Sequence, residues 1–208
     1  QNHRWALRPN EEGVYSPVVD KTTVRLFLAK VASKKMFLEQ LDIVAAFLNA
    51  PVSREVFIRL PKQFTNDGDA VRKLIKALYG LDDAPRLWNA EFVSFMMSIG
   101  FKQSAADPCL FTSEDGTTIL VLYVDDILLA SITKQALEKF IKDISGRFEV
   151  RRMGVPQTFL GIDLTYKQEE GSVFLSQGNY VRSLATHYGV EHAHSVTTPM
   201  ADDIYVEL

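Results

Sequence analysis

Two adjacent acidic residues, Asp125 and Asp126, interrupt an otherwise apolar stretch that runs from Leu120 to Ala130. Burying one unpaired carboxylate costs several kcal/mol after the protein relaxes, and two neighbouring carboxylates also repel each other. One interpretation is an exposed turn, because Asp is common in turns. The other is a bound divalent cation, because Mg²⁺ prefers carboxylate oxygens and completes its coordination with water and substrate phosphate.

Asp42 supplies a third acid at the end of another predicted strand, which begins at Phe37. Alone, an Asp at a strand end is usually a cap or turn residue. Beside Asp125 and Asp126 it would complete a carboxylate cluster for two metal ions roughly 4 Å apart, a geometry that activates an attacking hydroxyl and stabilises a departing pyrophosphate. The three acids together point to phosphoryl-transfer chemistry.

The elements that must position these acids follow from hydrophobic periodicity. The spacing predicts helices over residues 22–33, 85–99, 136–144 and 180–188, and strands over 37–42, 56–60, 71–75, 108–112, 117–124, 127–130, 159–166 and 172–175. Asp125 and Asp126 lie near the tip of a hairpin formed by 117–124 and 127–130. Because helices and hairpins are mixed without regular alternation, the predicted class is α+β with a mainly antiparallel sheet.

Composition excludes several classes of protein. With 47% hydrophobic residues in 208, the chain is neither collagen-like nor disordered, and its net charge of −3 shows no overall basic excess. The single cysteine, Cys109, favours a reducing compartment. The apolar tract Ile119–Ala130 is too short to predict a membrane span.

The basic residues between 134 and 152, Arg151 and Arg152 among them, are interpreted as a solvated face. A start at Gln1 indicates a piece of a longer polypeptide.

An ordered series of motifs covers nearly the whole chain. The strings are Tyr15–Val19, Leu41–Asn49, Leu78–Leu81, Ala84–Arg86 with Trp88, Gly100–Phe101, Ala106–Phe111, Tyr123–Asp126, Phe159–Asp163, Leu175–Gln177 and Thr197–Met200. This series resembles the reverse transcriptase of Ty/copia-type LTR retrotransposons. One Tyr-x-Asp-Asp match would be weak, whereas the ordered series is specific.

The resemblance implies a polymerase right-hand fold within one reverse transcriptase domain over residues 1–208. The fingers would comprise about 1–41 and 50–105, and the palm about 42–49 and 106–166, with an antiparallel palm sheet backed by helices. Residues from about 167 to 208 would begin an incipient thumb.

The resemblance also implies roles for individual residues. Asp42, Asp125 and Asp126 match the catalytic carboxylates, which together with the backbone carbonyl of Ile43 would hold two Mg²⁺ ions, for which Mn²⁺ would substitute. Phe47 matches the aromatic residue beneath the sugar of the incoming nucleotide, although its spacing suits a plain core residue nearly as well. The residues expected at primer and template are Tyr123, Val124, Pro85, Arg86, Phe159, Leu160 and Gly161.

The chain departs from the family pattern in two places. Where the family has Lys-Gln, this chain has Asp82 and Asp83, two anions that oppose phosphate binding beside the expected template and nucleotide. The basic residues of the fingers that would cradle the triphosphate have only a shortened counterpart around Arg4 and Arg8. Solvated terminal arginines are the alternative interpretation of that pair.

The predicted function is therefore an RNA-directed DNA polymerase that adds deoxynucleoside triphosphates to a primer 3′ end on an RNA or DNA template. Partners in the parent element would be the protease, integrase and RNase H of a Pol polyprotein, and the location would be intracellular, in cytoplasmic virus-like particles. The alternative is a catalytically impaired retroelement remnant that binds nucleic acid, which Asp82 and Asp83 favour and the intact acid triad opposes. A metal-dependent nuclease built on the same carboxylates is a further rival.

Overall fold

The computed structural model describes residues 14–194 apart from 53, 61–62 and 64–70. The chain divides into two units, of which the larger comprises residues 1–156 with 166–173 and the smaller comprises 157–165 with 174–208. All three candidate acids belong to the larger unit.

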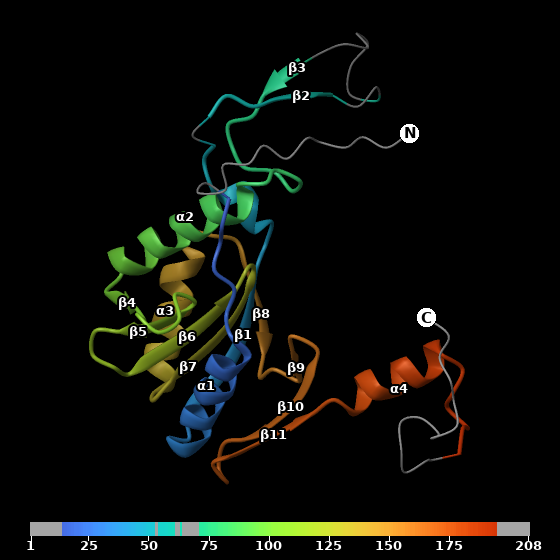
Figure 1. The fold of residues 1–208 in the computed structure, drawn as a ribbon. Coiled ribbons are helices and arrows are strands. Elements are labelled where there is room, and N and C mark those ends of the chain that lie inside the picture. The colour runs from blue at the N-terminus through green and yellow to red at the C-terminus, as the bar shows by residue number, and fades with distance from the viewer. Residues whose placement is uncertain (1–13, 53, 61–62, 64–70, 195–208) are drawn as a thin grey trace. The chain divides into compact units, whose positions relative to one another are not determined.

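The larger unit is built on a six-stranded sheet in the order β4–β5–β6–β7–β1–β8 (Figure 1). All of its strand pairs are antiparallel. The strands are β1 (Phe37–Ile43), β4 (Phe101–Gln103), β5 (Leu110–Ser113), β6 (Thr118–Tyr123), β7 (Asp126–Ser131) and β8 (Val150–Gly154). Because β1 lies between β7 and β8, the sheet brings the end of β1 to segments that follow it by more than eighty residues.

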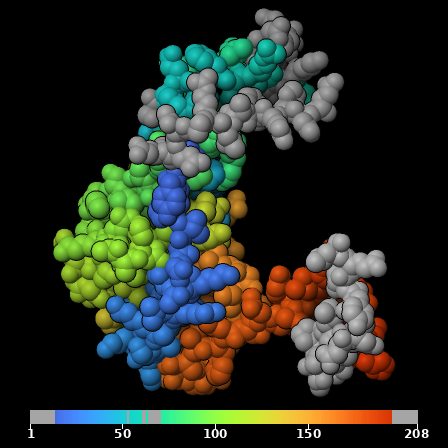
Figure 2. All heavy atoms as spheres, in the orientation of Figure 1, coloured from blue at the N-terminus to red at the C-terminus, as the bar shows by residue number. Residues whose placement is uncertain are grey.

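Helices cover both faces of this sheet (Figure 1). Helices α2 (Ala84–Ser98) and α3 (Lys134–Ser145) cover one face, and α1 (Lys21–Ser33) lies against the other. Figure 2 shows α1 in blue and the segment from α2 to α3 in green to yellow as one continuous body. Strand β6 is consequently buried at every position before Tyr123, which explains why its sequence is apolar from Ile119 to Leu122.

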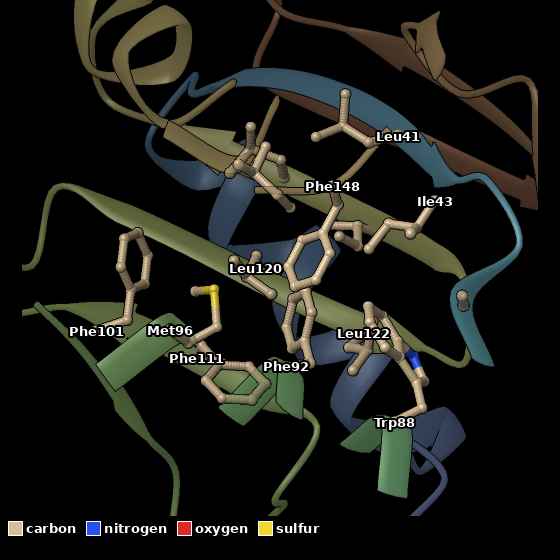
Figure 3. Close-up of a cluster of buried hydrophobic side chains, with 14 of the residues drawn as sticks. Leu41, Ile43, Trp88, Phe92, Met96, Phe101, Phe111, Leu120, Leu122 and Phe148 are labelled. Atoms are coloured by element: carbon tan, nitrogen blue, oxygen red, sulfur yellow. The ribbon is translucent and has the colours of Figure 1, made fainter. Parts of the chain in front are cut away.

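The core on the α2 and α3 face is aromatic (Figure 3). Leu120 and Leu122 of β6 pack there with Trp88 and Phe92 of α2. The ring of Phe148 lies 5.2 Å from that of Trp88, centroid to centroid, in an edge-on arrangement. Such aromatic contacts add stabilisation beyond the area they bury. This cluster fixes α2 against the end of the sheet that carries the acids.

Local signals account for the helix starts. The side chain of Asp20 accepts the N–H of Thr22 at 2.6 Å at the beginning of α1, and Thr133 accepts the N–H of Ala136 at 3.2 Å at the beginning of α3. Such N-caps contribute about 1 kcal/mol each. Pro85 lies in the first turn of α2, where its missing N–H costs nothing.

Smaller elements complete the two units. The larger contains a 3₁₀ helix, η2 (Ala46–Asn49), and a hairpin of β2 (Phe57–Arg59) with β3 (Val71–Lys73). A three-stranded sheet in the order β11–β10–β9 consists of β9 (Thr158–Phe159), β10 (Ile162–Lys167) and β11 (Ser172–Ser176). Helix α4 (Gly178–His187) follows it. Within the described part of the chain, no helix has the length and apolar character needed to cross a membrane.

The predicted mixture of helices and antiparallel strands is confirmed, with three differences in detail. Strands β4 and β8 were not predicted, because β4 has only three residues and β8 has no buried residue to mark an alternating pattern. The single strand expected over 159–166 is wrong: Leu160 and Gly161 adopt positive φ angles of 50° and 76°, and the chain turns there between β9 and β10.

Candidate active site

Strand register brings the three predicted acids to one end of the sheet. Asp42 on β1 lies directly opposite Asp126 on β7, and Asp126 in turn lies opposite Tyr123 on β6. Directly opposed residues of an antiparallel pair project their side chains from the same face, with Cβ atoms about 5 Å apart. Asp125 occupies the turn between β6 and β7, and its carbonyl accepts the N–H of Ile43 at 2.9 Å.

The turn that carries Asp125 has an unusual backbone. Val124 has a φ of 57°, a left-handed value that is a genuine outlier for a β-branched residue. The buried indole of Trp88 donates its Nε1–H to the carbonyl of Val124 at 2.6 Å. Strained residues of this kind persist where surrounding contacts determine the conformation, and they concentrate at functional sites. Helix α2 therefore holds the turn in a fixed geometry.

The acid cluster carries negative charge that is only partly compensated. Burial raises the pKa of Asp126, and the nearby charges of Asp125 and Asp42 raise it further. A hydrogen bond from Nε2 of Gln40 to Oδ1 of Asp126, at 3.3 Å, opposes this increase. On the other side, Nη1 of Arg151 lies 3.9 Å from Oδ2 of Asp42.

The acids supply donors of the kind that divalent cations prefer. In the part of the chain that the structure describes, no three His, Cys, Asp or Glu side chains form a preformed metal cluster. Gln40 and Arg151 instead engage Asp126 and Asp42. The donor set nevertheless fits a divalent ion, because it consists of hard carboxylate oxygens, and burial together with the charges of Asp125 and Asp42 raises the pKa of Asp126.

An aromatic pair lies beside the acids. The ring of Phe47, on η2, is 9% exposed and belongs to the core cluster, and the ring of Tyr79 lies over it with a centroid distance of 4.5 Å. Tyr79 is 54% exposed, and its pKa is raised by burial and by the charges of Asp125 and Asp42. Sequence reasoning gave no role to Tyr79, although it lies within the quoted Leu78–Leu81 string.

A cavity of about 310 Å³ adjoins the strained turn. Phe47, Pro85, Trp88 and Val124 are among the residues that line it. Two residues predicted at primer and template, Pro85 and Val124, are therefore neighbours of the predicted nucleotide residue Phe47. The cavity joins Phe47 to Val124, the residue that precedes Asp125 in the turn.

The other predicted site residues lie in several different elements. Arg86 is half-buried in the first turn of α2, and Tyr123 is half-buried at the end of β6. Phe159, Leu160 and Gly161 belong to the smaller unit, at the turn between β9 and β10. Arg4 and Arg8 lie outside the described residues.

The two acids that depart from the family pattern have different environments. Asp83 is buried, with 7% exposure, and accepts two hydrogen bonds from Arg54, Nε to Oδ2 at 2.9 Å and Nη2 to Oδ1 at 3.0 Å. This ion pair holds the pKa of Asp83 below its usual value. Asp82 is exposed. Arg54 therefore neutralises one of the two anions that were expected to oppose phosphate binding.

The fold and the site define an α+β domain with a carboxylate triad at the end of an antiparallel sheet. Residues 5–202 match the protein family described as "Reverse transcriptase (RNA-dependent DNA polymerase)". A "Retrovirus-related Pol polyprotein from transposon TNT 1-94" of Nicotiana tabacum is 35% identical over 193 residues, covering 90% of this chain and 14% of that protein. The corresponding polyprotein from transposon RE1 of Arabidopsis thaliana is 35% identical over 191 residues, covering 90% and 13%.

A more distant relative comes from yeast. The "Putative transposon Ty5-1 protein" of Saccharomyces cerevisiae is 25% identical over 166 residues, which is 78% of this chain and 54% of that protein. The chain belongs to the reverse transcriptase family, and the resemblance to Ty/copia-type retrotransposons is confirmed. The family activity is RNA-directed DNA polymerisation, and its members use divalent metal ions. These comparisons do not favour the impaired remnant.

Proposed function

We propose that this chain is the catalytic core of a retrotransposon reverse transcriptase and extends a primer 3′ end on an RNA or DNA template. The observation that carries the proposal is the register of the sheet. Asp42 lies opposite Asp126, and Asp125 occupies the adjoining turn. Three acids from two distant segments thus meet at one sheet end, as a two-ion site requires.

The acids would act as the ligands of the metal ions. Asp42, Asp125 and Asp126, with the backbone carbonyl of Ile43, would hold two Mg²⁺ or Mn²⁺ ions. The bound ions would activate the primer hydroxyl and stabilise the departing pyrophosphate. Trp88 contributes by holding the carbonyl of Val124, which keeps the adjoining Asp125 in place.

The remaining residues would bind the substrates. Phe47 would lie beneath the sugar of the incoming deoxynucleotide, with Tyr79 on its exposed side, and the triphosphate would meet Arg4 and Arg8. Primer and template would contact Tyr123, Val124, Pro85, Arg86 and the turn of Phe159, Leu160 and Gly161. In this proposal the fingers comprise about 1–41 and 50–105, the palm 42–49 and 106–166, and the thumb begins at about 167.

The wider setting is also part of the proposal. The first relatives are Pol polyproteins of which this chain matches about one seventh. We place its activity in such a polyprotein, beside protease, integrase and RNase H, within virus-like particles. The pairing of Asp83 with Arg54 supports an active enzyme over an impaired remnant, because it removes one of the two phosphate-repelling charges.

Primer extension on a homopolymer template tests the proposal. Asp42→Asn and Asp125→Asn should each lower extension by about 100-fold or more, because each removes charge that stabilises the transferring phosphoryl group. Asp143→Asn is the matched control: this half-buried acid on α3 should be dispensable. Extension retained by either site variant at the level of the control would overturn the two-ion assignment, and cleavage without nucleotides would indicate a nuclease.

A further inference from the structure

Two adjacent arginines on β8 lie on opposite faces of the sheet. Arg151 lies directly opposite Asp42 of β1, whereas Arg152 lies opposite Leu41. Successive side chains of a strand point to opposite faces. Arg151 therefore shares the face of the catalytic acids, and Arg152 shares the face covered by α3. Both arginines are exposed, as the interpretation of this basic run as a solvated face expects, and each also has an acidic partner.

Arg152 fastens β8 to its neighbours. Its guanidinium donates to both carboxylate oxygens of Glu39 at 2.5 and 2.8 Å, and to both of Glu138 at 2.8 Å. Glu39 is 8% exposed on β1, and Glu138 belongs to α3. These bonds hold the pKa of Arg152 above its usual value. One side chain thus binds β8 to both a strand and a helix, which keeps Arg151 in register with Asp42.

Arg151 and Asp42 form an ion pair that can separate easily. Nη1 of Arg151 lies 3.9 Å from Oδ2 of Asp42, and the arginine side chain is 68% exposed while that of Asp42 is 30% exposed. Exposed ion pairs of this kind contribute little to stability, and a long arginine side chain has solvent to move into. The charge of the Asp42 carboxylate is therefore compensated by Arg151, but the arginine is not held permanently against it.

We propose that Arg151 is the resting counter-charge of Asp42, and that a divalent cation entering the acid cluster displaces it from that carboxylate. This inference rests on the proposed function of the acids. The guanidinium and the cation would compete for the carboxylate of Asp42, so each would weaken the binding of the other. The competition therefore raises the divalent concentration that is needed for a given occupancy of the site. Arg152 is a positioning residue that maintains the exchange geometry.

The test is isothermal titration calorimetry, in which Mn²⁺ is titrated into the whole chain without nucleic acid. Arg151→Gln should bind Mn²⁺ about two- to fivefold more tightly than the unmodified chain, because the competing charge is gone. Arg151→Lys retains the charge and should remain near the original affinity. Arg147→Gln is the matched control, since it removes the same charge from a nearby arginine that pairs with Glu91 on α2.

A double-mutant cycle locates the effect. In an Asp42→Asn background, Arg151→Gln should no longer change Mn²⁺ affinity, because the contested carboxylate is absent. The inference is overturned when Arg151→Gln leaves affinity unchanged or weakens it, or when Arg147→Gln tightens binding equally, which would indicate a general charge effect. Failure of the proposed function gives a different result. In that case Asp42→Asn would bind Mn²⁺ no more weakly than the unmodified chain does, and the proposed exchange would be excluded as well.

Discussion

Asp83 and Asp82 are adjacent acids for which the structure predicts different consequences of substitution. Asp83→Asn keeps the size of the side chain and removes the charge that Arg54 binds through two hydrogen bonds. A buried charge-assisted bond contributes about 1.5–3 kcal/mol. The Arg54 side chain is 53% exposed while that of Asp83 is 10% exposed, so solvent screening reduces the loss to about 1–2 kcal/mol. In a chain of this length the melting temperature should fall by about 2–8 °C.

Asp82→Lys should leave the melting temperature almost unchanged, because Asp82 is exposed. It should instead raise affinity for primer–template, since a repelling charge becomes an attracting one. One added phosphate contact steepens the slope of log K against log salt by about 0.7–0.9. Fluorescence anisotropy of a labelled primer–template between about 50 and 200 mM salt measures both effects. Arg54→Gln is the control for stability and should reproduce the loss seen with Asp83→Asn.

The pH dependence of the Asp83 effect has a definite sign. Because Arg54 lowers the pKa of Asp83 in the folded chain, the stabilisation is complete above the unfolded value of about 4 and is lost as the pH falls through the folded value. The melting difference between the unmodified chain and Asp83→Asn should therefore shrink below about pH 4. The reasoning is refuted when Asp83→Asn melts normally at neutral pH and raises nucleic-acid affinity as much as Asp82→Lys.

Three further predictions concern the site. Phe47→Ala should lower the free energy of unfolding by about 3 kcal/mol, because the ring is buried, and should raise ribonucleotide use in primer extension; unchanged selectivity would leave Phe47 a core residue only. Trp88→Phe keeps an aromatic ring but removes the hydrogen bond to Val124, so extension should fall more than chemical denaturation shows stability to fall; equal losses would contradict a positioning role. Without metal, Asp126→Asn should gain thermal stability relative to the unmodified chain as the pH rises above about 4, because the folded pKa of Asp126 is raised. A difference in melting temperature that stays constant from about pH 4 to 7 would contradict this.

The sequence alone determined the chemistry and much of the local structure. Asp125 and Asp126 stand out because their charges interrupt an apolar stretch, and that stretch is apolar because helices cover both faces of β6 and β7. The long helices were predicted because their apolar spacing and N-terminal residues act over only a few positions. The ordered motifs then led to the reverse transcriptase family, which the comparisons confirmed.

The tertiary structure alone decided which charges meet. Strand β8 gave no signal because an exposed edge strand needs no apolar alternation, yet its pairing with β1 places Arg151 opposite Asp42. The partnership of Arg54 with Asp83 joins residues 29 positions apart. Such contacts depend on strand order and chain reversal, which no window of neighbouring residues encodes. The sequence therefore predicted the acids of the site, whereas the fold determined the cations that compensate them.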